Sequence, residues 1–188
     1  MTPEQLPTAK VLVAGATKVG KTSLVNSLVF LNFFDVSPTI GVNFAQKTIV
    51  GEDGPLNLSI WDLSGQERFR FLMPQLCGGA AGIVLVFDQT RPASLKKAGK
   101  WLKFASKFAR PSYQFATVLA GTKADLTSKT SSATIKAFCS EYQVPEYFQC
   151  SAKTGENVSE VFTAICSAIQ RCTPELVASP NIIRPCQL

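Results

Sequence analysis

A glycine-rich segment near the N-terminus combines the residue types that bind phosphate groups. Residues 15–22 read GATKVGKT, in which two glycines are separated by four residues and followed by a lysine and a threonine. The glycines let the backbone curl until its N–H groups point inward at an anion, as in a P-loop. Lys21 then supplies a cation for the β- and γ-phosphates, and the Thr22 hydroxyl can ligate magnesium. The predicted phosphate-binding residues are Gly15, Thr17, Lys18, Val19, Gly20, Lys21, Thr22 and Ser23.

A second segment carries an acid, a glycine and a glutamine in an order that suits phosphoryl transfer. Residues 62–67 read DLSGQE and follow the apolar stretch 58–61. An acid at the end of a strand, here Asp62, can hold magnesium through water. Gly65 can donate its backbone N–H to a γ-phosphate, and Gln66 stands where a side chain can orient an attacking water. A P-loop alone leaves ATPases, kinases and GTPases open, and this segment narrows that choice.

The composition excludes several other chemistries. The 188 residues contain no histidine, which removes Ser–His and Cys–His nucleophiles, histidine bases and most zinc sites. The formal net charge is +6, but no block of five or six basic residues is present, so we expect no nucleic-acid partner. The six cysteines form no CxxC pair and no secretory signal is visible, which favours reduced thiols and a cytoplasmic location.

The order of apolar segments predicts an α/β fold. Short runs rich in β-branched residues predict strands at 10–14, 42–50, 56–61, 83–87, 117–120 and 147–150. Longer periodic stretches predict helices at 21–31, 67–75, 92–109, 132–142 and 158–171, the fourth capped by Ser131. Asp53-Gly54 signals a hairpin, which makes one edge strand antiparallel. We therefore expect a six-stranded, mostly parallel sheet with about five helices covering both faces.

Four further motifs follow the P-loop in a recognisable order. They read TIGVNF at 39–44, DLSGQERF at 62–69, TKAD at 122–125 and SAK at 151–153. Together they resemble the Ras superfamily of small GTPases, and within it the Rab branch. The resemblance spans residues 9–171 and implies a P-loop NTPase with a Ras-like G domain. It leaves residues 1–8 as an N-terminal extension and residues 172–188 as a flexible C-terminal tail.

The resemblance also implies a ligand set. Thr39 would bind both magnesium and the γ-phosphate, with Thr22 as the other direct metal ligand and Asp62 nearby. Gly65 would join the phosphate-binding residues. Asp125 would accept hydrogen bonds from guanine N1 and N2, which adenine cannot offer in that arrangement. The implied guanine-binding residues are Thr122, Lys123, Asp125, Ser151, Ala152, Lys153 and, by stacking on the base, Phe33.

Four positions depart from the usual family pattern. Thr122 stands where the guanine motif normally opens with asparagine; with GVNF and the stretch 87–95, it resembles the septum-promoting GTPases of fungi and plants. Thr17 replaces a glycine that many relatives carry beside the γ-phosphate. The segment before Thr39 is one residue shorter than expected. The chain ends in PCQL, whereas a CaaX box needs cysteine fourth from the end, so we expect an unmodified tail, with lipidation of Cys186 as the alternative.

The predicted helix 92–109 has three distinct faces. An apolar stripe that should face the sheet consists of Leu95, Ala98, Leu102, Ala105 and Ala109. A lysine line beside it consists of Lys96, Lys100, Lys103 and Lys107, which form either a solvated face or a surface for an acidic partner or lipid head groups. An aromatic line consists of Trp101, Phe104 and Phe108, which either pack under a neighbouring element or form a partner surface.

These observations predict a monomeric, cytoplasmic Rab-like GTPase that cycles between GTP and GDP with Mg²⁺ as cofactor. Gln66 would be the catalytic residue, and hydrolysis would be slow without an activating protein. Exchange factors and effectors are the other expected partners, and peripheral membrane association stays open. A non-hydrolysing nucleotide-bound scaffold is the alternative; Thr17 favours it, and Gln66 and Thr39 argue against it. A nucleotide kinase or ATPase is disfavoured by Asp125 and the SAK loop.

Overall fold

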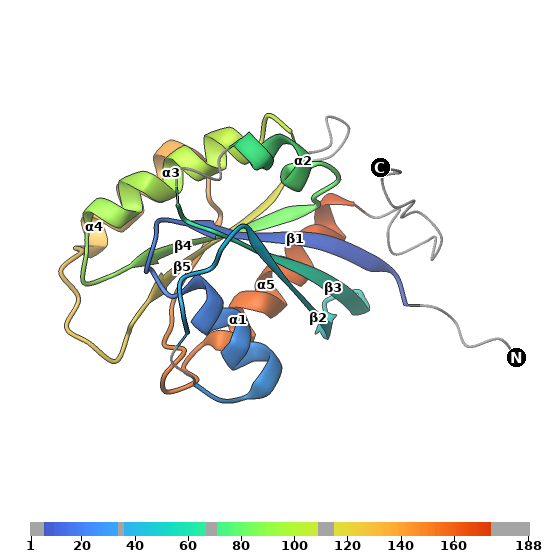
Figure 1. Ribbon diagram of the computed structural model, residues 1–188, viewed down its shortest axis with the longest axis horizontal. Coiled ribbons are helices and arrows are strands. Elements are labelled where there is room, and N and C mark those ends of the chain that lie inside the picture. Colours follow the sequence, from blue (N-terminus) through green and yellow to red (C-terminus); the bar gives the residue numbers. More distant parts are fainter. Residues whose placement is uncertain (1–5, 34–35, 67–70, 109–114, 174–188) are drawn as a thin grey trace, which may run out of the picture.

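The fold is built around one mixed β-sheet (Figure 1). A computed structural model describes residues 6–33, 36–66, 71–108 and 115–173. The strands are β1 (Thr8–Gly15), β2 (Val42–Gly51), β3 (Gly54–Leu63), β4 (Gly82–Asp88), β5 (Ala116–Thr122) and β6 (Glu146–Gln149). The helices are α1 (Lys21–Phe30), α2 (Met73–Cys77), α3 (Ala93–Ala105), α4 (Ser132–Tyr142) and α5 (Val158–Cys172).

Strand order confirms the expected sheet. The order is β2-β3-β1-β4-β5-β6, and every neighbouring pair is parallel except β2 with β3. The β2–β3 hairpin turns at Glu52 and Asp53, as the Asp-Gly signal predicts. Figure 1 shows α1 and α5 below the sheet and α2, α3 and α4 above it. Within the described residues, the sheet therefore has six strands covered by five helices, as expected from the sequence.

The two sheet faces bury separate apolar clusters. Alternate residues of the inner strands point to opposite faces, so Val11 and Val13 pack with α1 and α5, whereas Leu12 packs with α3 and α4. Helix α5 contributes a nearly continuous buried side that includes Phe162 and Ile165. The five described cysteines are free, which agrees with reduced thiols. The motifs predicted from the sequence lie at or near the ends of these strands.

Two predicted helices differ from the structure by more than one residue at an end. Of the stretch 67–75, residues 67–70 lie outside the described residues, and α2 begins only at Met73 and runs on to Cys77. Helix α3 ends at Ala105 because the chain tightens there to a shorter hydrogen-bond spacing. Phe108 N donates to Ala105 O at 3.0 Å. The predicted member Ala109 lies outside the described residues.

The aromatic line on α3 divides between core and surface. Trp101 is buried with the α3 side of the core, and Phe104 is half-buried against it. Phe108 remains 36% exposed. Leu95, Ala98 and Ala105 are buried as the stripe predicts. Packing under neighbouring elements therefore accounts for Trp101, whereas the lysines stay at the surface.

Candidate nucleotide-binding site

Every predicted motif lies at the carboxyl-terminal edge of the sheet. The P-loop follows β1, Asp62 lies near the end of β3, and Thr122 ends β5. Strand β1 lies between β3 and β4, so the strand order reverses at the P-loop. In open α/β sheets ligands bind at such a reversal, outside the carboxyl ends of the strands. The topology thus gathers residues far apart in sequence into one site.

The P-loop backbone passes through left-handed conformations. Gly20 precedes α1 with φ of 92°, and Lys18 has φ of 59°, so both residues occupy the left-handed region. Thr17 and Lys18 have exposed side chains, whereas Val19 is fully buried and contributes its backbone. Thr22 is half-buried in the first turn of α1, as is the following predicted residue, Ser23. The N-terminus of α1 faces this loop and favours an anion.

Lys21 is held inside the loop that it follows. Only 6% of the residue is exposed, and Nζ donates to Ala16 O at 2.9 Å. Burial lowers the pKa of Lys21 to about 8, while the negative charge of Asp62 opposes this shift. Within the described residues Lys21 forms no ion pair, so an incoming phosphate would give the buried ammonium a directly bound anion. The residue is thus placed for the phosphate role that the motif predicts.

Two hydroxyls and a carboxylate converge beside the P-loop. Thr22 Oγ1 lies 2.7 Å from Thr39 Oγ1 and donates to Asp62 Oδ2 at 2.5 Å. The other carboxylate oxygen, Asp62 Oδ1, is buried without a hydrogen-bond partner. Burial raises the pKa of Asp62, although the Thr22 hydrogen bond, the Lys21 charge and the Thr39 hydrogen bond oppose the shift.

This oxygen cluster fits a magnesium ion. Mg²⁺ prefers hard oxygen ligands and is commonly bound by few protein groups together with phosphates and water. Among the described residues no group of three or more His, Cys, Asp or Glu side chains can hold a metal. A cation here would therefore depend on the Thr22 and Thr39 hydroxyls, the orphaned Asp62 oxygen and the nucleotide itself.

The segments around Thr39 and Gln66 are joined to each other. Ser64 Oγ donates to Thr39 O at 2.8 Å, and Gln66 Nε2 donates to the same carbonyl at 3.3 Å. Ser64 N also donates to Gly41 O at 2.9 Å. Ser64 was not among the predicted site residues, yet it is fully buried at the centre of this contact. The two segments are thus held as one unit.

Gly65 packs directly on the P-loop backbone. A Cβ atom at this position would lie 2.5 Å from both Ala16 C and Thr17 N, so only glycine fits without displacing the loop. The Gly65 backbone therefore lies directly against the backbone of Thr17. Binding of a terminal phosphate by the Gly65 N–H stays a prediction.

The base-binding motifs meet through Ser151. Its hydroxyl donates to Asp125 Oδ1 at 2.6 Å and accepts from Lys153 N at 3.2 Å. Asp125 is exposed, and its Oδ2 has no donor within the described residues, so it is available to a base. Ala152 is half-buried in the same loop.

Phe33 does not join that cluster. Its side chain is 44% exposed on the loop after α1. Among the described residues, no hydrogen bond or ring contact links it to the base-binding loops. Stacking of Phe33 on the base therefore stays a prediction.

Thr122 ties the P-loop to the neighbouring strand. Its hydroxyl is near two carbonyl oxygens, Val19 O at 2.5 Å and Phe87 O at 3.0 Å, and the residue is 2% exposed. A hydroxyl carries one proton and can donate fully to only one of them at a time. The cross-link is therefore incomplete, whereas an asparagine amide could serve both carbonyls.

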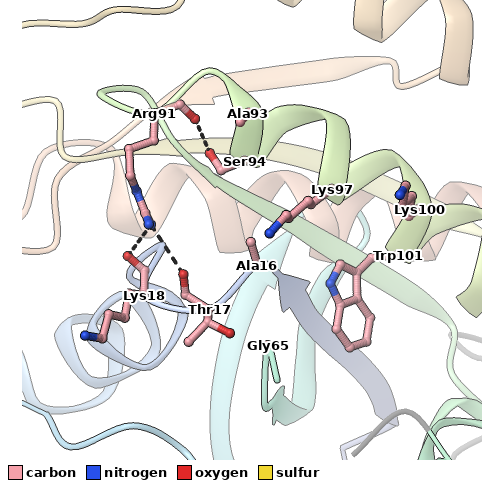
Figure 2. Close-up of a pocket in the computed structure, with 10 residues that line it drawn as sticks. All are labelled: Ala16, Thr17, Lys18, Gly65, Arg91, Ala93, Ser94, Lys97, Lys100 and Trp101. Atoms are coloured by element: carbon pink, nitrogen blue, oxygen red, sulfur yellow. Dashed lines mark hydrogen bonds between the residues drawn. The ribbon is translucent and has the colours of Figure 1, made fainter. Parts of the chain in front are cut away.

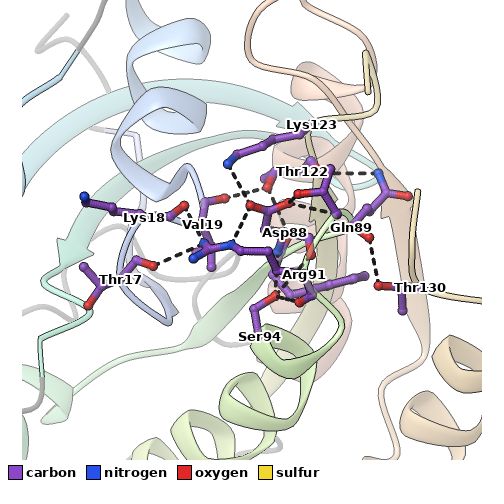
Figure 3. Close-up of polar contacts among 12 residues, drawn as sticks. Thr17, Lys18, Val19, Asp88, Gln89, Arg91, Ser94, Thr122, Lys123 and Thr130 are labelled. Atoms are coloured by element: carbon purple, nitrogen blue, oxygen red, sulfur yellow. Dashed lines mark hydrogen bonds and ion pairs between the residues drawn. The ribbon is translucent and has the colours of Figure 1, made fainter. Parts of the chain in front are cut away.

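Sequence reasoning missed an acid and a base that brace the site, Asp88 and Arg91 (Figure 3). Asp88 Oδ2 accepts from Arg91 Nε at 2.9 Å and from Lys123 Nζ at 2.7 Å. Arg91 also donates to Thr17 O at 3.3 Å and to Lys18 O at 2.7 Å. Burial alone would raise the pKa of Asp88, but the bonds from Lys123, Thr90 and Arg91 outweigh it and lower the pKa.

Comparison with known proteins decides the family. A model of the Ras family matches residues 10–171. The chain belongs to the Ras family. It is 35% identical over 170 residues to Ras-related protein Rab-7b of Mus musculus, covering 89% of this chain and 85% of the relative. It is 36% identical over 173 residues to Ras-related protein RABD2c of Arabidopsis thaliana, covering 90% and 84%. It is 38% identical over 167 residues to GTP-binding protein ypt4 of Schizosaccharomyces pombe, covering 85% and 70%.

These relatives confirm that the Ras-family chain is a Rab-like small GTPase that acts as a molecular switch. Nothing in them favours the non-hydrolysing scaffold. The narrower resemblance to the septum-promoting group stays a prediction, as do the roles of individual residues. Within the part of the chain that the structure describes, no helix combines the length and apolar character needed to span a bilayer.

Proposed function

We propose that this Rab-like protein hydrolyses GTP to GDP and phosphate slowly, with Mg²⁺ as cofactor, and regulates signalling or trafficking. Lys21 and the P-loop N–H groups would hold the phosphates, while Asp125 and Ser151 would select guanine. Gln66 would orient the attacking water. When bound, the metal would neutralise charge on the β- and γ-phosphate oxygens. Thr22 and Thr39 would hold it directly, with Asp62 through water.

The observation that best supports a switch is that Thr39 contacts both the proposed metal site and the Gln66 segment. Its hydroxyl joins the Thr22–Asp62 cluster, while its carbonyl accepts from Ser64 and Gln66. A γ-phosphate that binds Thr39 and the Gly65 N–H would therefore order both segments at once. Loss of that phosphate would remove the contacts that it makes with both segments and so weaken their order.

We propose slow intrinsic turnover because few of the described arginine side chains can stabilise the charge on the γ-phosphate. Residues 33–44 contain no arginine, so this segment cannot supply a finger that stabilises charge on the γ-phosphate. Arg91 is the nearest described arginine to the P-loop, and its guanidinium is already bound to Asp88 and to P-loop carbonyls. An arginine finger is typically worth about 10³ to 10⁵ in rate, so we propose that an activating protein supplies it.

Partner recognition would use apolar side chains beside the same segments. Ile40 is 73% exposed, Phe44 is 64% exposed and Phe71 is 73% exposed. The Phe44 ring packs edge-on against Trp61 with centroids 4.7 Å apart. Exposed apolar clusters of this kind mark protein contacts. We therefore propose that effectors read the order of the Thr39 and Gln66 segments through this surface.

The proposal is tested by following the bound nucleotide. Purified protein is loaded with GTP, freed of excess nucleotide, and sampled over hours by chromatography with Mg²⁺ or with EDTA. We expect slow conversion to GDP with Mg²⁺ and faster nucleotide loss with EDTA. GTP that persists unchanged, with or without an activating protein, would favour the non-hydrolysing scaffold instead.

We further propose a cytoplasmic monomer, and membrane flotation of the full chain would reveal peripheral association.

A further inference from the structure

A cavity lies between the P-loop and α3 (Figure 2). Its volume is about 380 Å³. The P-loop and Gly65 form one wall, and the first turns of α3 form the other. The α3 residues that matter for its chemistry are Lys97, Lys100 and Trp101. Figure 2 shows Lys97 reaching from α3 toward the P-loop at Ala16, with the Trp101 indole beside it.

This cavity is separate from the phosphate cradle but shares a wall with it. Lys21, Thr22 and Asp62, which form the proposed phosphate and metal site, do not line it. Thr17 and Gly65 do line it, and both belong to the proposed γ-phosphate site. The two sites are therefore adjacent and share part of their lining. Anything bound in the cavity would contact residues whose position depends on the γ-phosphate.

Among the residues that the structure describes, the cavity lining is positively charged and includes no acid to match its lysines. Arg91 is neutralised by Asp88, but within the described residues neither Lys97 nor Lys100 forms an ion pair. Helix α3 contains four lysines and no aspartate or glutamate. Two unpaired ammonium groups on successive turns of one helix repel each other, and an anion between them removes that repulsion. The cavity chemistry thus selects a negatively charged occupant.

We propose that this cavity receives a carboxylate side chain from an acidic segment of a partner protein when the protein is in its GTP state. The inference rests on the proposed switch function and names the chemistry of one partner. A cavity of this size is at the small end of ligand sites and suits a few side chains. Lys97 and Lys100 both line the cavity, which an inserted side chain can enter, whereas a flat bilayer surface would meet only its rim. A protein segment therefore fits better than lipid head groups.

Dependence on the nucleotide follows from the shared wall. Gly65 is packed against Ala16 and Thr17 in the structure, which closes the cavity on that side. If the γ-phosphate holds Gly65 there, its loss would let the wall move and open the cavity to solvent. A carboxylate would then be more hydrated and more weakly bound. The acidic segment should consequently bind the GTP form more tightly than the GDP form.

The test uses an acetylated hexaglutamate peptide as probe and the full chain as target. The protein has two tryptophans, so ¹⁵N-tryptophan labelling gives two indole signals, assigned with Trp61→Phe. The peptide is titrated at low ionic strength into protein loaded with a non-hydrolysable GTP analogue or with GDP. Lys97→Glu reverses a charge inside the cavity. Lys96→Glu makes the same change on the preceding residue of α3, which is also exposed but does not line the cavity.

We expect a saturable shift of the Trp101 signal, tighter with the GTP analogue, while the Trp61 signal stays in place. Lys97→Glu should weaken binding at least about tenfold, and Lys96→Glu by less than about threefold. Equal effects of the two variants, or equal binding to both nucleotide forms, would overturn the proposal. The proposal would also be overturned if wild-type protein bound phosphatidylserine vesicles but not the peptide, and both variants lost the vesicle binding. The lysines would then bind lipid head groups and not an acidic protein segment. Protein that exchanges nucleotide normally but ignores the peptide would refute the docking site and leave the switch intact.

Discussion

The Lys123 ammonium lies 2.7 Å from Asp88 Oδ2, so an acid at the end of β4 fixes the lysine of the guanine motif. The same oxygen binds Arg91, whose guanidinium reaches the carbonyls of Thr17 and Lys18. The P-loop and the base-binding segment are therefore braced against one buried carboxylate. This arrangement gives Asp88 a positioning role, although it contacts no part of the nucleotide in our proposal.

Replacing that carboxylate should loosen both segments together. In Asp88→Asn, Lys123 and Arg91 lose their charged partner, and we expect GDP to dissociate about tenfold faster and the unfolding free energy to fall by about 2 kcal/mol. Fluorescent-GDP release by stopped flow checks the first expectation. Glu141→Gln, which alters an exposed acid on α4, serves as the control. Unchanged GDP release in Asp88→Asn would show that the brace is irrelevant to the nucleotide.

The same carboxylate sets a pH dependence. Its pKa in the folded protein is lowered below the unfolded value, so the ionised form stabilises the fold. That contribution is fully present above about pH 4, the ordinary pKa of aspartate, and is lost as the pH falls through the lowered folded pKa. Denaturant unfolding between pH 7 and pH 3 should therefore show a smaller loss of stability in Asp88→Asn than in wild type.

Thr122 also links the P-loop to β4, but its hydroxyl has one proton and can donate to only one of the two carbonyls at a time. Thr122→Asn supplies two N–H donors, one for Val19 O and one for Phe87 O, and should slow GDP release several-fold. Thr122→Val keeps the shape but leaves both carbonyls without this donor, which costs about 1–3 kcal/mol and should speed release. Measured GDP dissociation rates should rank Val fastest, Thr intermediate and Asn slowest. An asparagine variant as fast as wild type would contradict the argument.

Much of this site could be predicted from the sequence because parallel strands bring their carboxyl ends to one edge. Lys21 and Thr22 open α1 and Asp62 lies near the end of β3, and the chemistry expected of each follows from its residue type. Asp88 also ends a strand, but it contacts side chains rather than ligand, so no spacing revealed it. The bond between Arg91 and Thr17 joins residues 74 positions apart, which only the folded topology determines.

Magnesium dependence should separate the two nucleotides. In Thr22→Asn the hydroxyl that contacts Thr39 and Asp62 is lost, and with it one of the oxygen groups that we propose would hold Mg²⁺ beside the phosphates. GTP affinity should therefore fall more than GDP affinity, by about tenfold or more. Thr22→Ser keeps the hydroxyl and is the matched control. Competition titrations that give Thr22→Asn the same loss for both nucleotides would remove Thr22 from the metal site.

We expect residues after the end of α5 to contribute nothing to the stability of the fold. Gln170 Nε2 donates to Gly54 O at 3.0 Å, and Arg171 pairs with Glu52 and Glu146. Deletion of residues 174–188 spares these contacts, and its Tm should stay within about 1 °C of wild type. Deletion from Gln170 removes them and should lower Tm by several degrees, about 2–4 °C per kcal/mol lost. A large drop on the shorter deletion would show that the tail packs on the domain.

Turnover should respond in opposite directions to changes at Gln66 and Thr17. The Gln66 amide already reaches the Thr39 carbonyl at 3.3 Å, so it belongs to the segment that would face the γ-phosphate. Gln66→Leu removes the group that orients water, and we expect slower hydrolysis than the slow wild type. The Thr17 backbone packs against Gly65, and its branched side chain is exposed. We expect this side chain to occupy part of the space that Gln66 and an incoming arginine need.

Thr17→Gly should consequently hydrolyse GTP faster than wild type, most clearly with an activating protein present. Single-turnover phosphate release on the three proteins measures the order directly. Bound-nucleotide content, determined before each run, controls for a change in loading rather than chemistry. If Thr17→Gly matched wild type under both conditions, the threonine would not obstruct the site. If Gln66→Leu released phosphate as fast as wild type, Gln66 would not position the water, and hydrolysis would have to depend on another group.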